Sequence, residues 1–181
     1  MLLSAKDSLL LIVDAQEKLL PVIHHYDQVS ARIRWLAEVA LQLEVPLLIT
    51  EQYPKGLGYS LPNLKEVVEA AEVIEKTHFS AMKEEGFAGV LEQYGKRQIV
   101  VIGMEAHVCV LQTALDIKAQ GYDVFLATDC IGSRRPADKD AGIERMRDNG
   151  VNIITSEMAA LEWVEKSATE TFRHISRNWL K

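Results

Sequence analysis

Cysteine is scarce in this chain, with only Cys109 and Cys130 among 181 residues. Two thiols exclude a disulfide-rich scaffold, so the fold has to be held together by its core. Free thiols persist in a reducing compartment, and we therefore expect a cytoplasmic protein. The first residues also lack the basic start and apolar core of a signal peptide.

Long uncharged apolar runs and an excess of positive charge are missing as well. No segment approaches the roughly 18 apolar residues of a membrane helix, so no membrane partner is expected. Lys and Arg number 20 against 26 Asp and Glu, which gives a formal net charge of −6. Nucleic acids and anionic membranes attract basic surfaces, so this balance argues against both as partners. No G-x-G-x-x-G and no phosphate-binding loop is present, which argues against a nucleotide-dependent enzyme.

The chain shows no internal repeat, no low-complexity segment and no Gly/Ser linker, so residues 1–181 are expected to form a single domain. What recurs is a short continuous apolar run followed by a longer amphipathic segment. Continuous apolar character indicates burial on both faces, as in parallel strands. The runs expected to form strands are 9–13, 45–49, 73–74, 99–102, 124–127 and 151–154.

Segments with helical spacing separate these runs. The stripes are Ile33, Leu36, Ala37, Ala40 and Leu41 in one segment, Val108, Leu111, Leu115 and Ala119 in another, and Phe172, Ile175 and Trp179 near the end. Alternating strands and helices predict an α/β fold, a three-layer αβα arrangement with a six-stranded parallel sheet. The last helix is expected to dock either on its own core or on a neighbouring subunit.

Three chemically active side chains follow predicted strands. Asp14 closes the first strand, Lys76 the third, and Cys109 comes a few residues after the fourth. Ligands of open α/β sheets bind beyond the carboxyl ends of the strands, so an acid, an amine and a thiol are expected at one edge. Taken singly, Asp14 also fits a helix cap, Lys76 a solvated surface charge, and Cys109 a small buried apolar residue.

Cys109 is predicted to lie in the first turn of a helix. There the positive end of the backbone dipole favours thiolate, so its pKa is expected to be lowered. A nearby lysine would act in the same direction. Cys130 is expected to be structural.

Three separated motifs resemble those of a known family. They read Leu11-Ile12-Val13-Asp14-Ala15-Gln16, Lys76-Thr77-His78-Phe79-Ser80 and Val101-Ile102-Gly103-Met104-Glu105-Ala106-His107-Val108-Cys109-Val110, followed by Ala127-Thr128-Asp129-Cys130. With these motifs in this order, most of the chain resembles the isochorismatase-like (cysteine hydrolase) superfamily. The segment 50–58 is similar to that of YcaC-like and isochorismatase domain-containing proteins.

The resemblance implies a Rossmann-like fold and an Asp-Lys-Cys triad at Asp14, Lys76 and Cys109. It also implies a non-proline cis peptide at Met104–Glu105 and an oxyanion hole made by the backbone N–H groups of Glu105 and Cys109. The expected activity is hydrolysis of a small-molecule amide, or of a related C–N or ester bond, through a thioester. No cofactor is expected. Relatives are commonly dimers or larger rings, so a homo-oligomer is expected.

The chain departs from the family's nicotinamidases after the second strand. Those members carry an Asp-x-His metal motif, whereas this chain reads Glu51-Gln52-Tyr53. Zinc needs such ligands at close range, so no metal is expected, and the adjacent His24 and His25 are interpreted as surface residues. Gln16, Tyr53 and Phe79 flank the motifs and are candidates for substrate contact, although aromatic residues near strand ends are as often packing.

Two other hypotheses stay open at this stage. In one, the chain is a redox-responsive or binding module that keeps the triad geometry without turnover, its thiol being oxidised rather than acylated. In the other, it is an assembly subunit. The hydrolase is favoured because three triad residue types at one sheet edge are otherwise hard to explain.

Overall fold

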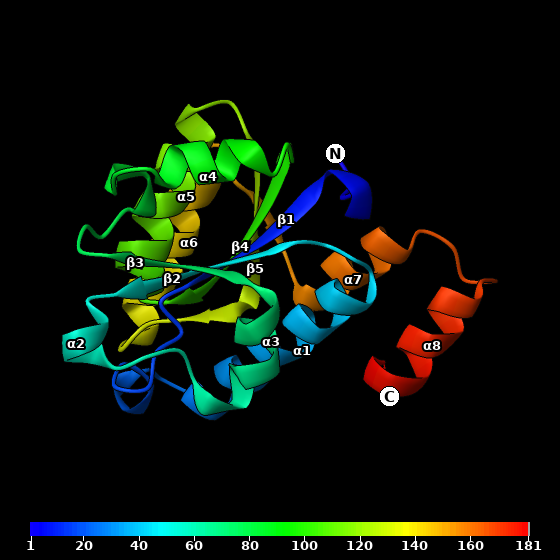
Figure 1. Ribbon diagram of the computed structural model, residues 1–181, viewed down its shortest axis with the longest axis horizontal. Coiled ribbons are helices and arrows are strands. Elements are labelled where there is room, and N and C mark those ends of the chain that lie inside the picture. Colours follow the sequence, from blue (N-terminus) through cyan, green and yellow to red (C-terminus); the bar gives the residue numbers. More distant parts are fainter. Residues whose placement is uncertain (181) are drawn as a thin grey trace.

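The computed structural model describes residues 1–180, and a sheet of six parallel strands forms its centre (Figure 1). The strands are β1 (Ser8–Val13), β2 (Leu47–Gln52), β3 (Glu72–Lys76), β4 (Gln98–Met104), β5 (Asp123–Gly132) and β6 (Asn152–Ile154). They lie in the order β3-β2-β1-β4-β5-β6. The six predicted strands and the α/β class are confirmed. The order changes direction between β1 and β4, which is where ligands bind in such sheets.

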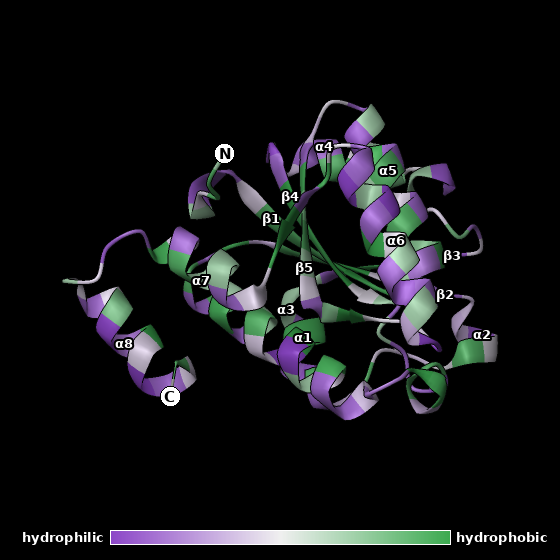
Figure 2. Cartoon of the chain, turned by 180° about the vertical axis from the view of Figure 1, so that it is seen from behind, coloured by the Kyte–Doolittle hydropathy of each residue, from purple (hydrophilic) through white to green (hydrophobic). Residues whose placement is uncertain are grey.

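Helices cover both faces of the sheet. On one face lie α1 (Tyr26–Gln42), α3 (Lys65–Ala70) and α7 (Ser156–Val164), and on the other α4 (Phe87–Gln93), α5 (Leu111–Ala119) and α6 (Pro136–Asp148). Successive residues of β1 alternate between the two cores: Leu10 and Ile12 pack in the first, Leu9 and Leu11 in the second. Figure 2 shows the apolar strands enclosed by helices with hydrophilic outer surfaces. The three-layer prediction is therefore confirmed.

Short elements complete the chain. They are η1 (Ala5–Asp7), η2 (Leu20–Val22), α2 (Pro54–Leu57), η3 (Pro62–Leu64), η4 (Ala81–Lys83) and the π-helical turn η5 (Ala106–Val110). The π-helical turn η5 runs directly into α5, with wider turns than an α-helix. The buried apolar residues of α5 are Leu111, Ala114 and Ile117, whereas Ala119 is exposed. The predicted stripe is confirmed at Val108, Leu111 and Leu115, which pack in the second core, and is wrong at Ala119.

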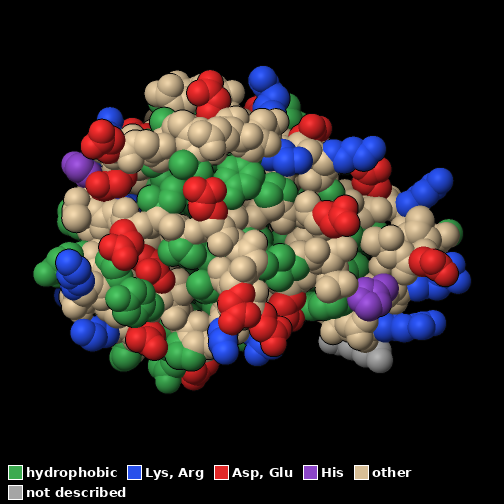
Figure 3. Space-filling view, viewed as in Figure 1, with side chains coloured by type: hydrophobic (Ala, Val, Ile, Leu, Met, Phe, Trp, Pro, Cys, Tyr) green, Lys and Arg blue, Asp and Glu red, His purple; other side chains and the backbone are tan. Residues whose placement is uncertain are grey.

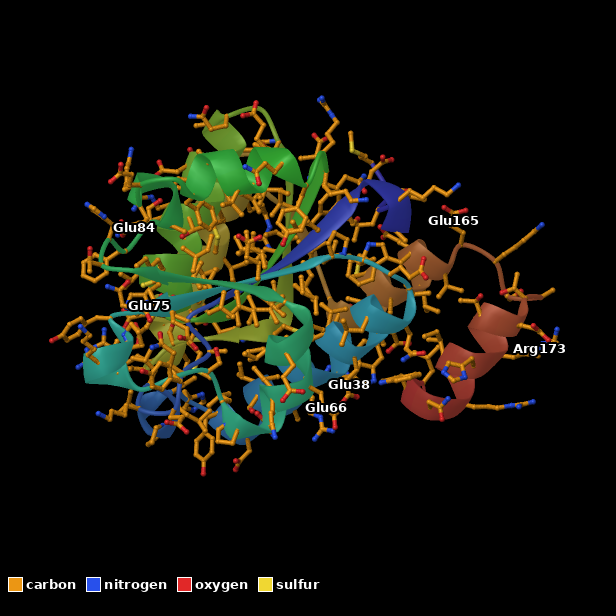
Figure 4. All side chains as sticks on the ribbon, viewed as in Figure 1. Glu38, Glu66, Glu75, Glu84, Glu165 and Arg173 are labelled. Atoms are coloured by element: carbon orange, nitrogen blue, oxygen red, sulfur yellow. The ribbon has the colours of Figure 1, made fainter. Side chains whose placement is uncertain are left out.

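The last helix, α8 (Glu170–Trp179), packs against α1 of its own chain at the right of Figure 1. Ile175 is fully buried in the core shared with α1. The indole of Trp35 donates to the carbonyl of Trp179 (2.7 Å), and the indole of Trp179 donates to Glu38 (3.1 Å). Glu38 is labelled on α1 in Figure 4. The predicted stripe therefore docks, at least in part, on the chain's own core.

Charged side chains of both signs cover the face seen in Figure 3, with Lys and Arg frequent at the end where α8 lies. Within residues 1–180, no helix combines the length and apolar character needed to span a membrane.

Candidate active site

The three predicted triad residues lie at the carboxyl edge of the sheet. Asp14 follows β1 directly, Lys76 ends β3, and Cys109 sits in η5 after β4. The ammonium of Lys76 lies 2.8 Å from Oδ2 of Asp14. The Cys109 thiol is electrostatically coupled to the same carboxylate: it lowers the pKa of Asp14, and the Asp14 charge raises the pKa of Cys109. Three strands therefore deliver an acid, an amine and a thiol to one buried point.

Asp14 is fully buried, and each of its oxygens has a partner. Thr50 donates its hydroxyl to Oδ1 (2.8 Å), and Lys76 donates to Oδ2. Burial raises the pKa of Asp14 above its ordinary value, while Lys76, Thr50 and Cys109 act against that rise. The carboxylate serves no helix terminus; it faces the amine and the thiol. This arrangement makes it the candidate proton acceptor for Cys109.

Lys76 is held by four acceptors. Its Nζ donates to Asp14 Oδ2 (2.8 Å), to Gln52 Oε1 (2.6 Å) and to the carbonyls of His78 and Phe79 (3.2 Å each). The side chain has no exposed surface, so the alternative of a solvated surface charge is wrong. A buried ammonium needs such compensation to stay charged.

The segment after Lys76 is itself fixed by Glu84. Glu84 Oε2 accepts from the backbone N–H groups of Thr77 (2.9 Å) and His78 (3.2 Å) and lies 3.0 Å from Nδ1 of His78. These contacts, led by the Thr77 N–H, lower the pKa of Glu84 to about 2. Figure 4 labels Glu84 at the edge of the molecule. Glu84 thus orders the loop whose carbonyls receive Lys76.

Cys109 departs from the sequence prediction in its ionisation. Its residue is only 5% exposed, and burial raises the pKa of the thiol to about 12. The negative charge of Asp14 acts in the same direction, and Lys76 opposes it. The expectation of a lowered pKa is wrong because desolvation and the adjacent carboxylate outweigh any helix dipole at this short π-helical turn. At neutral pH Cys109 is therefore a thiol.

The turn before Cys109 also differs from expectation. All peptide bonds within residues 1–180 are trans, so the predicted cis bond at Met104–Glu105 is wrong. The chain reverses instead through a left-handed conformation at Glu105, with φ 59° and ψ 60°. Arg134 holds the Glu105 carboxylate through Nε (3.1 Å) and Nη2 (3.4 Å). The N–H groups of Glu105 and Cys109 belong to this turn, and their role as an oxyanion hole stays a prediction.

The three candidate substrate contacts occupy different environments. Gln16 is fully buried, and its amide is bonded to Gln52 and Gly58, so it presents no free polar group to a substrate. Tyr53 and Phe79 are each 56% exposed and follow β2 and β3. The carbonyl of Phe79 receives Lys76, which places this residue beside the triad. Substrate contact by Tyr53 and Phe79 stays a prediction.

Sequence reasoning overlooked Thr50, Gln52 and Glu84. Thr50 and Gln52 are polar residues at the end of the apolar run of β2, which is the same signal that identified Asp14. Applied to every strand, that signal would have found both. Glu84 does not follow an apolar run, so this signal would not have found it. Its contacts depend on how the loop after β3 folds back.

Cys130 and the adjacent His24 and His25 lie apart from this arrangement. Cys130 is fully buried in the core beneath α1. His24 and His25 are exposed, with ring centroids 3.9 Å apart. In the part of the chain that the structure covers, no three His, Cys, Asp or Glu side chains are grouped to hold a metal ion.

Comparison with known proteins supports the motif resemblance. A model of the isochorismatase domain matches residues 8–158. Isochorismatase family protein 1A of Dictyostelium discoideum is 34% identical over 177 residues, covering 96% of this chain and 86% of the relative. Isochorismatase domain-containing protein 2 of Danio rerio is 33% identical over 175 residues, covering 97% and 88%.

Solved structures with the same fold carry two kinds of description. A MAR1 ribonuclease from Caenorhabditis elegans has a TM-score of 0.92 and 32% identity, covering 100% of this chain and 93% of that one. YcaC from Pseudomonas aeruginosa, solved with hexane-2,5-diol and covalent acrylamide, has a TM-score of 0.92 and 28% identity, covering 99% and 92%. YcaC from Escherichia coli, described as an octameric hydrolase of unknown specificity, has a TM-score of 0.93 and 25% identity, covering 99% and 91%. These neighbours support a hydrolytic role.

Proposed function

Because the chain belongs to the isochorismatase family, we propose that it is a cysteine-dependent hydrolase of a small-molecule amide or of a related C–N or ester bond. The reaction runs through a thioester at Cys109. The observation that carries this proposal is the buried Lys76–Asp14 ion pair next to a protonated thiol. A thiol with a raised pKa needs a base in contact with it, and Asp14 is that base.

In the first half-reaction the Cys109 sulfur attacks the carbonyl carbon while its proton passes to Asp14. The carbonyl oxygen becomes an oxyanion, which the N–H groups of Glu105 and Cys109 are proposed to bind. When the tetrahedral species collapses, the C–N bond breaks and Asp14 returns the proton to the leaving amine. Lys76, paired with Asp14, stabilises its carboxylate form.

In the second half-reaction water replaces the amine. Asp14 removes a proton from the water, whose oxygen attacks the thioester carbon. Collapse breaks the C–S bond, releases the carboxylic acid and returns the proton from Asp14 to the sulfur. Atoms and electrons balance without an external group, so the proposed reaction uses no cofactor.

The environment of Cys109 favours acylation over a redox role. Redox-sensing cysteines combine a low pKa with solvent access. Cys109 has a raised pKa and is 5% exposed. The covalent acrylamide in the P. aeruginosa relative adds support, since acrylamide reacts with nucleophiles and is itself a small amide.

Ribonuclease activity, named for the C. elegans relative, is the second candidate. The formal net charge of −6 weighs against an RNA substrate. Incubation with single-stranded and duplex RNA, beside Cys109→Ala, tests it directly. Cleavage that persists in Cys109→Ala would come from chemistry other than that proposed here.

The proposed hydrolase is tested by covalent trapping. The protein is mixed with a panel of small amides and esters, quenched in acid within seconds, and examined by intact-mass and peptide mass spectrometry. We expect an acyl adduct on Cys109 that is lost in Cys109→Ala and kept in the matched control Cys130→Ala. An iodoacetamide-reactive Cys109 that no amide or ester acylates would contradict the proposal.

A homo-oligomer is proposed by analogy with the octameric E. coli relative. Light scattering coupled to size-exclusion chromatography measures the molar mass against 20.3 kDa for one chain. A mass near that of one chain at micromolar concentration would contradict this proposal.

A further inference from the structure

A second network of side chains joins the ends of β1 and β2 beside the triad. Gln16 Nε2 donates to the carbonyl of Gln52 (3.0 Å), and Gln16 Oε1 accepts from the N–H of Gln52 (2.7 Å). The Gln16 amide thus pairs with both backbone groups of Gln52, as a peptide group on a neighbouring strand would. It also donates to the carbonyl of Gly58 (2.6 Å). Because Gln16 is fully buried, this pairing fixes the end of β2.

The side chain of Gln52 continues the network to β3. Its Oε1 accepts from Nζ of Lys76 (2.6 Å), and its Nε2 donates to the carbonyl of Thr77 (2.7 Å). An ammonium offers only donors and a carbonyl only acceptors, so these two partners define which way the amide points. The Gln52 side chain is therefore hydrogen-bonded both to the ammonium of Lys76 and to the backbone carbonyl of the next residue, Thr77.

These contacts link Gln16, Gln52, Lys76 and Asp14 in one closed network. Asp14 and Gln16 are two residues apart, Gln16 holds Gln52, Gln52 holds Lys76, and Lys76 returns to Asp14. We propose that Gln52 is a positioning residue that keeps the Lys76 ammonium against Asp14, and that Gln16 acts through Gln52. The inference rests on the proposed function, because the chemistry that it serves is the attack by Cys109.

Removing Gln52 has a defined electrostatic consequence. Lys76 has a four-carbon stem with free rotation, so loss of its 2.6 Å acceptor lets the ammonium move away from Asp14. Lys76 lowers the pKa of Asp14, and a displaced Lys76 lowers it less. Asp14 accepts a proton only when ionised. The acid limb of Cys109 reactivity should therefore move to higher pH.

The test is the pH profile of Cys109 alkylation by iodoacetamide, followed at the peptide level from pH 4 to 9. Gln52→Met and Gln16→Met are compared with wild type, Lys76→Met and Asp14→Asn. Gln98→Met is the matched control, since Gln98 is a buried glutamine that bonds Ser4, Ser8 and the carbonyl of Leu2 near the start of β4. Circular dichroism confirms that each variant folds. If Gln52→Met fails to fold, Gln52→Asn replaces it, because it withdraws the amide from Lys76 by one methylene.

We expect Gln52→Met to raise the acid midpoint by about one pH unit, a roughly tenfold loss of rate below it. Gln16→Met should shift the midpoint in the same direction by less, and Gln98→Met should leave it unchanged. A Gln52→Met profile that overlays wild type while Lys76→Met is shifted would overturn the positioning role alone. Profiles unchanged in both Lys76→Met and Asp14→Asn would instead overturn the proposed function.

Discussion

Lys76 and Asp14 form an ion pair with 2.8 Å between Nζ and Oδ2, and neither side chain has any exposed surface. Burying two charges costs several kcal/mol for each ion, and their attraction offsets this only when further hydrogen bonds complete the arrangement. Gln52, Thr50 and two backbone carbonyls supply those bonds. The pair is therefore better explained by chemistry at Cys109 than by stability.

Breaking one side of this pair should be more damaging than removing both charges. Lys76→Met leaves a buried carboxylate without its cation, and we expect a loss of about 3–5 kcal/mol in the free energy of unfolding. Asp14→Asn combined with Lys76→Met removes both charges and should recover most of that loss. Urea unfolding measures each value. Lys65→Met, which breaks the exposed Lys65–Glu69 pair (3.8 Å), is the control and should change little.

Additive effects of Asp14→Asn and Lys76→Met in this cycle would contradict the coupling between the two charges. Additivity is expected only for side chains that share no partner, so a large interaction energy is the outcome that the 2.8 Å contact predicts.

The pH dependence of Cys109 reactivity should follow Asp14 rather than the thiol. Above the raised pKa of Asp14 and below the thiol pKa of about 12, the site holds a carboxylate and a thiol. As pH falls through the pKa of Asp14 the base is protonated and the rate is lost. Alkylation should therefore rise once, at a pH above the ordinary pKa of an aspartate, and then stay flat until the thiol itself ionises.

Asp14→Asn supplies the control for this profile. Without the carboxylate the flat region should disappear, and the rate should rise only as the thiol itself ionises at alkaline pH. Cys130, which is fully buried, should not react in either protein. A wild-type profile with a single inflection near pH 8.5 would be incompatible with Asp14 as base.

Much of this site could be predicted from the sequence because strand ends are visible there. Asp14 and Lys76 each follow an apolar run, and parallel strands bring such ends to one edge. Their separation across β2 is then spanned by the length of the lysine side chain, so the contact follows from topology. The same reasoning located Cys109 after β4.

What could not be predicted depends on packing around those positions. The pKa of Cys109 is raised by burial and by the Asp14 charge, and neither can be predicted from the residues around Cys109 in the sequence. The stripe through α5 holds at Leu111 and Leu115 and fails only at Ala119, which is the last residue of the helix and is exposed. Gln16 was assigned to substrate contact although its amide is used inside the fold.

Asp129, in the segment Ala127-Thr128-Asp129-Cys130, is expected to matter for stability and not for the reactivity of Cys109. Its carboxylate accepts from the N–H of Ser156 (2.8 Å) at the start of α7 and from Nε of Arg32 (3.1 Å). Asp129→Ala leaves these donors unpaired and should cost about 1–3 kcal/mol in urea unfolding. The alkylation profile of Cys109 should be unchanged. A shifted profile would mean that Asp129 acts on the site.

Gly103 should tolerate no side chain, because it links the packing of the sheet to the position of Asp14. Its φ is +131°, and a Cβ there would overlap the carbonyl of Val13, the residue before Asp14. Gly103→Ala combines backbone strain with a clash against a central strand, so we expect a loss of at least about 3 kcal/mol and an unreactive or unfolded Cys109 site. Gly89→Ala in α4 is the matched control: its Cβ meets open space, and a gain of up to about 1 kcal/mol is expected. Equal unfolding midpoints for the two variants would contradict this prediction. They would mean that β4 and β1 can move apart enough to admit a methyl group at residue 103 without a loss of stability.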